Sequence, residues 1–260
     1  MLFRSEEKAV FDRELEDAIL PEMEKQARGP NDYYVQTTKA FLLMRKGAEK
    51  RREARDAFAV AARERPDIVA TQDIVLSLDI SLDDPESAER HARDVLRRNR
   101  NSPLANYVMG SLSLKRGEMD AAERYLRKAA DARNPVVLAM NDLAEVLRRT
   151  KRYPEAERYA RMAVNANPNL YVAWETVGSI LMDAGGDLDE AQHFIEKAVE
   201  LSKVDGRSED VRMLISLARL NALKGDKKTA RIALRKIQSR LGELSDYEKR
   251  EYDELMKHVR

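Results

Sequence analysis

Residues 134–168, NPVVLAMNDLAEVLRRTKRYPEAERYARMAVNANP, contain two short amphipathic segments joined by a tight turn. The first segment has apolar residues three to four positions apart, which form one stripe along a helix: Leu138, Leu143, Val146 and Leu147. The second has a similar stripe with several small residues: Ala156, Tyr159, Ala160, Met162, Ala163 and Ala166. Because two such helices cannot bury both stripes alone, the pattern predicts that the pair stacks against copies of itself.

Copies of this unit occur along the chain. Four alanines lie at intervals of 34 residues, namely Ala54, Ala88, Ala122 and Ala156. Ala191 and Ala230 continue the series after short insertions. A fixed period of this length indicates a repeat architecture in which neighbouring units share one thin core.

A 34-residue helix–turn–helix period with small residues at fixed places resembles the tetratricopeptide repeat. The family's small eighth position falls on Ala40, Gly110, Ala144, Gly178 and Ala218. Seven residues after the periodic alanines stand Ala61, Val95, Ala129, Ala163, Ala198 and Ile237. Pro66 and Pro168 close two units, and Trp174 matches the family's opening tryptophan. The resemblance covers roughly residues 33–241. It is weaker in the second unit, with Leu76 and Asp79, and in the sixth, with Asn221.

The resemblance implies an all-α fold, an α-solenoid of about six helix–turn–helix repeats with an extra helix at each end. We expect a leading capping helix in residues 1–30, the six-repeat superhelix in residues 31–242 and a C-terminal capping helix in residues 243–260. Glycine inside a helix costs about 1 kcal/mol relative to alanine, so Gly110 and Gly178 predict a close approach between the helices of a pair. The linker at residues 203–207 is the best candidate for a hinge.

The two ends of the chain carry their own signals. The leading segment has apolar residues on one side: Val10, Phe11, Leu15, Ala18 and Ile19. Pro21 is expected to kink or restart this helix. The segment is interpreted as a fixed cap, with a detachable docking helix as the alternative. At the other end, Ser245 and Glu248 match a capping box that starts the last helix.

Composition excludes several classes of function. The 47 basic and 46 acidic residues give a formal net charge of +1, so no global field attracts nucleic acid or anionic membrane. The absence of cysteine excludes disulfides, zinc–thiolate sites and thiol nucleophiles. No apolar run approaches the roughly 20 residues of a membrane span. The cytoplasm is the default expectation, and the pattern fits equally the trimmed soluble part of an exported or anchored protein.

No motif for catalysis or for cofactor binding stands out. His91, His193 and His258 lie far apart in the sequence and are interpreted as surface residues. Residues 225–229, GDKKT, lack the first glycine of a phosphate-binding loop. Asp187, with the acidic residues after it, fits a helix start and lacks the alternation of a calcium loop. We therefore expect no enzyme activity, no cofactor and no metal.

The resemblance also implies a binding surface, because the first helices of tetratricopeptide repeats line a concave groove. The positions that face this groove carry over to Asp73, Ser77, Tyr107, Ser111, Leu114, Asn141, Glu145, Arg148, Glu175, Ser179 and Met182. One familiar groove of the family holds a peptide's terminal carboxylate with Lys, Asn and Arg. The lysine is absent near Thr37 and Tyr107, which disfavours capture of chaperone tails.

The sequence thus favours a non-enzymatic scaffold or adaptor that binds a peptide or helix of another protein in the concave groove. The alternative is a self-assembling structural protein that packs end to groove into homo-oligomers. Binding of nucleic acid is disfavoured because the predicted groove carries acidic residues, including Asp73, Glu145, Glu175 and Asp183.

Overall fold

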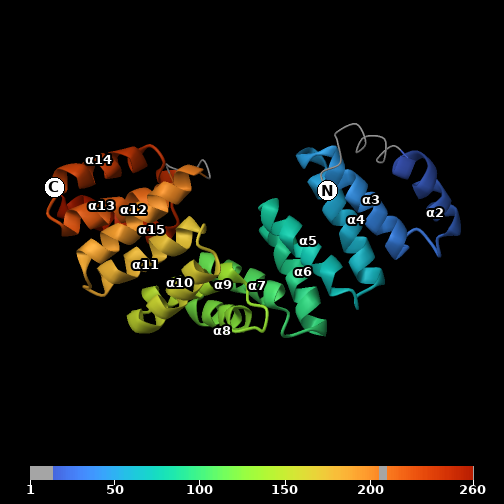
Figure 1. Cartoon of the computed structure of the whole chain (residues 1–260), viewed down its shortest axis with the longest axis horizontal. Coiled ribbons are helices and arrows are strands. Elements are labelled where there is room, and N and C mark those ends of the chain that lie inside the picture. Colours follow the sequence, from blue (N-terminus) through green and yellow to red (C-terminus); the bar gives the residue numbers. More distant parts are fainter. Residues whose placement is uncertain (1–13, 205–209, 260) are drawn as a thin grey trace. The chain divides into compact units, whose positions relative to one another are not determined.

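The computed structural model describes residues 14–204 and 210–259, and these residues are helical with no strand. Fourteen α-helices follow one another, mostly as antiparallel pairs joined by short turns (Figure 1). They are α2 (Leu20–Gln26), α3 (Tyr33–Lys46), α4 (Arg51–Glu64), α5 (Val69–Ser81), α6 (Pro85–Arg98), α7 (Pro103–Lys115), α8 (Met119–Ala130), α9 (Val137–Arg149), α10 (Tyr153–Ala166), α11 (Tyr171–Asp183), α12 (Leu188–Val204), α13 (Val211–Leu223), α14 (Lys227–Gln238) and α15 (Asp246–His258). Three short turns of other helix types complete the set: η1 (Leu15–Ile19), η2 (Ala48–Lys50) and η3 (Leu241–Glu243).

The helices form two compact units, residues 1–108 (unit 1) and residues 109–260 (unit 2). The division falls within α7, so the first part of that helix belongs to unit 1 and the rest to unit 2. The helical-repeat fold predicted from the sequence is confirmed. Of the candidate hinge at residues 203–207, the first two residues end α12 and residues 205–207 lie outside the described residues, as do Val10 and Phe11 of the leading segment.

In the five hairpins from α5–α6 to α13–α14, a residue in the left-handed conformation follows the first helix and reverses the chain. It recurs every 34 residues, at Asp83 (φ 48°), Gly117 (φ 76°), Lys151 (φ 61°) and Gly185 (φ 67°), and again at Gly225 (φ 84°). Glycine adopts this conformation without steric cost, whereas an ordinary L-residue costs roughly 1–2 kcal/mol. The packing between the two helices of each hairpin must therefore offset the backbone strain at Asp83 and Lys151.

The periodic alanines and the two helix-interior glycines are packing positions, as predicted. All six alanines of the series are buried. A Cβ atom on Gly110 would lie 2.6 Å from Cγ of Leu126, and one on Gly178 would lie 2.8 Å from Cδ1 of Ile195. A larger side chain at either glycine would force the second helix of the pair away from the first.

Local capping signals set where several helices begin. Asp84 accepts the backbone N–H of Ser87 and Pro85 is the first residue of α6. The predicted capping box is confirmed, since Ser245 accepts the N–H of Glu248 and the Glu248 carboxylate accepts the N–H of Ser245. Pro21 lies in the first turn of α2, directly after the π-helical turn η1, and Ile19 and Leu20 keep helical backbone angles, so the helix changes type there without a break.

The two ends of the chain pack differently. In unit 2, Tyr252 of α15 and Val259, directly after that helix, join the apolar core of α13 and α14. In unit 1, Ala18 and Ile19 of the leading segment are exposed. The leading segment contacts α3 through ion pairs, including Lys39 with Glu24 at 2.6 Å. Its role as a cap or as a docking element stays a prediction.

Candidate functional site

The first helices of unit 1 expose large apolar side chains. On α3, Tyr34 and Phe41 are 61% and 53% exposed, and their seven-residue spacing places them on one side of the helix. On α5, Val69 and Ile80 are exposed in the same way, eleven residues apart. The two helices meet at a hydrogen bond of 2.9 Å between the hydroxyls of Tyr33 and Thr71. Exposed aromatic and aliphatic side chains on neighbouring elements are typical of protein-binding surfaces.

Three of the predicted groove residues belong to unit 1, and they differ in exposure. Ser77 is exposed on α5 between Val69 and Ile80. Asp73 is half-buried, and burial raises the pKa of its carboxyl group. Tyr107 is buried. Among the three, only Ser77 presents its side chain freely to solvent.

Unit 1 also holds a cluster of charges inside the unit, between α4, α5 and α6. The fully buried carboxylate of Asp79 contacts Nη1 of Arg55 at 3.1 Å and Nδ1 of His91 at 2.7 Å. The same Arg55 nitrogen contacts Asp84 at 2.7 Å. This bond, together with the N–H of Ser87, lowers the pKa of Asp84 to about 2.

This cluster corrects the interpretation of His91 as a surface residue. Its ring is largely buried and binds Asp79, whereas His193 and His258 are exposed as predicted. The cluster also explains why Asp79 occupies a position where the repeat pattern expects an apolar residue, since Arg55 and His91 satisfy the buried carboxylate. Sequence periodicity could not show this, because the partners lie on three different helices.

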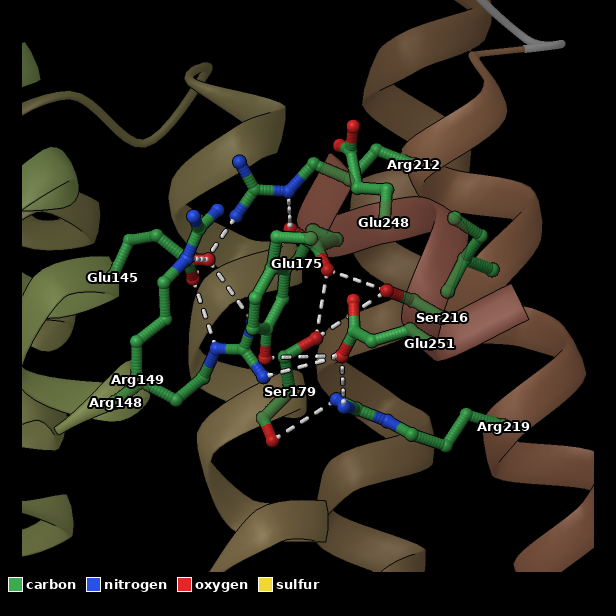
Figure 2. Close-up of a pocket in the computed structure, with 12 residues that line it drawn as sticks. Glu145, Arg148, Arg149, Glu175, Ser179, Arg212, Ser216, Arg219, Glu248 and Glu251 are labelled. Atoms are coloured by element: carbon green, nitrogen blue, oxygen red, sulfur yellow. Dashed lines mark hydrogen bonds and ion pairs between the residues drawn. The ribbon is translucent and has the colours of Figure 1, made fainter. Parts of the chain in front are cut away.

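In unit 2 the predicted groove residues of α9 and α11 are buried, and four of them, Glu145, Arg148, Glu175 and Ser179, belong to one network of hydrogen bonds and ion pairs. Glu145, only 2% exposed, is the centre of this arrangement (Figure 2). Its carboxylate accepts Nε of Arg148 at 2.8 Å, Nε of Arg149 at 2.6 Å and Nη2 of Arg212 at 3.4 Å. Burial by itself raises the pKa of Glu145, but the charges of Arg148 and Arg212 outweigh burial and hold that pKa well below its usual range.

A second carboxylate on the neighbouring first helix continues the network. Glu175 is 3% exposed and accepts Nε of Arg212 at 2.9 Å. It also accepts the hydroxyls of Ser179 and Ser216, the first at 2.7 Å (Figure 2). Burial lowers the pKa of Arg212, and the charges of Glu175 and Glu145 more than offset this, so that pKa lies above its usual value.

The last helix closes this face of unit 2. The Arg149 guanidinium carbon lies 4.0 Å from the centre of the Tyr247 ring. Glu251 accepts a hydrogen bond from Nη1 of Arg219 at 3.2 Å, as Figure 2 shows. Arg148 lies 3.7 Å from Glu251 and also binds Asp183. Burial raises the pKa of Glu251, with Arg148 and Arg219 acting against it. The term charge network below denotes Glu145, Arg148, Arg149, Glu175, Arg212, Arg219 and Glu251.

The remaining predicted residues of unit 2 differ in burial. Ser111 and Leu114 are half-buried on α7, and Met182 is buried on α11. Asn141 is buried on α9, and its Oδ1 atom has no hydrogen-bond partner among the described residues. No sequence pattern indicates Arg212, Arg219, Tyr247 or Glu251, because their contacts join helices up to about a hundred residues apart in the chain.

The described part of the chain has no group of three or more His, Asp or Glu side chains arranged to hold a metal ion. No helix within residues 14–204 and 210–259 is long and apolar enough to cross a bilayer.

The hairpin architecture defines an α-helical repeat protein, and comparison with known families agrees. The tetratricopeptide repeat family matches residues 79–136 and 107–170, and a further tetratricopeptide repeat matches residues 172–205. Residues 79–170 and 172–205 are therefore tetratricopeptide repeats. No match to a curated protein was found.

Solved structures show the same fold. A tetratricopeptide repeat protein from Parabacteroides merdae is similar, with a TM-score of 0.56 and 21% identity, over 95% of this chain and 90% of the other. PilW, a type IV pilus biogenesis factor, has a TM-score of 0.59 and 17% identity, over 86% and 98% of the two chains. YrrB, described as having an unusual peptide-binding site, has a TM-score of 0.51 and 21% identity, over 70% and 91%.

Proposed function

We propose that this protein is a non-catalytic scaffold that binds a segment of another protein, and that the first helices of unit 1 form the binding surface. The exposed apolar side chains of α3 and α5 carry this proposal. Of the ten large apolar side chains exposed in the described residues, six belong to unit 1. Protein interfaces bury such side chains at their centre. The peptide-binding site reported for YrrB, a protein of the same fold, gives the proposal a precedent.

The predicted groove residues of unit 2 fit this role less well. Glu145, Glu175 and Ser179 already have partners within the chain and are buried. A ligand that used them would have to replace those bonds and open the face that α15 covers. Alanine substitutions at Tyr107, Asn141 or Glu175 would therefore change folding as well as binding, and they cannot test the groove cleanly.

The test compares two variants that change only exposed apolar residues. Phe41→Ser/Ile80→Ser removes one exposed side chain from α3 and one from α5. Ile232→Ser, on α14 of unit 2, is the control because Ile232 is equally exposed. Each immobilised protein is exposed to a lysate of its source cells, and the captured protein is purified and its affinity measured by calorimetry.

We expect the wild type and Ile232→Ser to bind the captured protein equally, and Phe41→Ser/Ile80→Ser to bind at least tenfold more weakly. Equal affinity of all three would contradict the proposal. The same variants test self-assembly by sedimentation at several concentrations. If the wild type forms oligomers that the double variant does not, the surface binds a second copy of this chain, and the proposal of a different partner fails.

A further inference from the structure

A cavity of about 700 Å³ opens at one edge of unit 2, beside the charge network. Its walls come from the turn between α9 and α10, the ends of α11 and α13, and one side of α15. It is separate from the exposed first helices of unit 1, and its residues play no part in the function proposed above. A volume of this size holds a few side chains of a bound peptide.

The walls of the cavity carry an excess of positive charge. Five cationic side chains line it: Arg148, Arg149, Lys151, Arg219 and Arg250. Three carboxylates oppose them, and two of these, Asp183 and Glu251, already bind arginines of the charge network. The third is Glu254. The lining side chains therefore have an excess of +2, and Glu145, which binds Arg148 and Arg149 from behind the wall, reduces the local excess to +1.

Two of the five cations are available to a ligand. Lys151 and Arg250 are both exposed and line the cavity from different elements, one in the α9–α10 turn and the other on α15. Neither forms an ion pair within the described residues. Arg148 and Arg219 hold the floor of the cavity, where their carboxylate partners fix them. A ligand carboxylate could thus pair with Lys151 and Arg250 without breaking a bond of the folded chain.

The cavity also has an apolar side. Leu223, at the end of α13, is 49% exposed, and Ala222 and the half-buried Leu255 lie beside it in the wall. Tyr153 adds an aromatic ring from the start of α10. A small inorganic anion would leave this apolar surface in water, whereas a peptide with an apolar side chain next to its carboxylate would cover it.

From this combination we propose that the cavity binds an acidic peptide segment of a partner protein, with a Glu or Asp side chain between Lys151 and Arg250 and a neighbouring large apolar side chain against Leu223. The site differs from the terminal-carboxylate groove considered in the sequence analysis. It uses the turn after a first helix and the last helix of the chain, and it requires no free peptide end.

A peptide array tests the proposal without knowledge of the partner. The labelled full-length protein is incubated with synthetic eight-residue peptides in which acidic, basic and apolar residues vary independently. The best binders are then titrated by fluorescence anisotropy. Lys151→Glu/Arg250→Glu reverses the two available charges. Lys228→Glu/Arg235→Glu makes the same change of net charge at exposed positions of α14 that do not line the cavity.

We expect the binding peptides to be enriched in Glu or Asp beside Leu, Ile or Phe. Their affinity should fall at least tenfold in Lys151→Glu/Arg250→Glu and stay unchanged in the α14 control. Leu223→Ser should weaken peptides with an apolar neighbour and leave purely acidic peptides unaffected. The proposal is overturned if no acidic peptides are enriched, or if the pocket variant and the α14 control bind the best peptide equally well. Circular dichroism confirms that each variant is folded.

Discussion

The buried charges lie at different places within the repeats of the two units. In unit 1, Asp79 and its partners lie between α4, α5 and α6, and the first helices keep exposed apolar side chains such as Phe41. In unit 2 the charge network occupies the first-helix face itself, and α15 covers it with Tyr247 and Glu251. One repeat pattern thus builds an open apolar face in one unit and a closed polar face in the other.

The difference follows from a few side chains at equivalent repeat positions. The ninth position of the repeat is Ser77 on α5 and Glu145 on α9. A buried carboxylate is costly unless several cations surround it, so Glu145 requires arginines from its own helix and from α13. Those arginines in turn bind carboxylates of α11 and α15, which ties four helices together. The neutral side chain of Ser77 requires no surrounding cations, and the first-helix face around it remains exposed to solvent.

The largest expected effect comes from removing the centre of the charge network. Glu145→Ala leaves Arg148 and Arg212 without their shared carboxylate, so we expect the free energy of unfolding of unit 2 to fall by about 3–5 kcal/mol. Ser77→Ala, at the same repeat position in unit 1, should change stability by less than about 0.5 kcal/mol. Urea denaturation monitored by native-state hydrogen exchange would separate the two units. Similar losses in both variants would remove the contrast between the units.

Alanine at the eighth repeat position should act through opposite mechanisms in the two units. Leu76→Ala, in unit 1, removes a fully buried side chain and leaves a cavity, at a cost of about 2–5 kcal/mol. Gly178→Ala, in unit 2, adds a Cβ that would lie 2.8 Å from Cδ1 of Ile195 and 3.1 Å from the carbonyl oxygen of Ala191. Overpacking of this kind costs about 1–3 kcal/mol.

Thermal unfolding and the binding of xenon would distinguish the two mechanisms. Xenon should restore part of the lost stability of Leu76→Ala, because it fills an apolar cavity, and it should not affect Gly178→Ala. Gly242→Ala is the control, since a Cβ there meets nothing within 4 Å. A stable Gly178→Ala protein would show that the α11–α12 pair adjusts more easily than its close contact indicates.

The smallest effect is a dependence of stability on pH that is specific to Glu145. Its folded-state pKa lies below the ordinary value of 4.5, so its contribution is fully present above pH 4.5 and is lost as the pH falls through the folded-state pKa. The stability difference between wild type and Glu145→Gln should therefore shrink below pH 4.5, by at most about 1.4 kcal/mol per pH unit.

Glu251, in the same charge network, should contribute a pH dependence of stability of the opposite sign. Its folded-state pKa is raised, so its charge is disfavoured in the folded state and protonation on acidification favours folding. Relative to Glu251→Gln, the wild type should gain stability as the pH falls. Chemical denaturation at several pH values measures both differences. A pH-independent difference for Glu145→Gln would mean that the surrounding arginines do not hold that carboxylate ionised.

Much of the fold could be predicted because the signals are local or periodic. The alanines at 34-residue intervals and the close-packed Gly110 and Gly178 depend on contacts within one hairpin, which a single sequence period displays. The start of α15 was predictable for the same reason, since Ser245 and Glu248 satisfy each other three residues apart. The turn residues Asp83 and Lys151 also follow this period, and their places correspond to glycines in other repeats, which is a sequence signal for the turns.

The candidate sites could be predicted only in part. The resemblance assigned Ser77 and Glu145 to the same kind of position on a first helix, and the structure shows one exposed and the other buried. The exposure of such a residue depends on which distant parts of the chain pack against it. Glu145 is covered by Arg212 of α13 and by side chains of α15. Whether the predicted groove residues bind a partner stays a prediction.

The sequence by itself determined the helical hairpins, their period and their family, because helix formation, capping and close packing within a hairpin act over fewer than about forty residues. The tertiary structure decided which first helices remain accessible. That outcome depends on long-range charge pairing and on the packing of α15. These contacts join residues at irregular separations along the chain, so no sequence period predicts them.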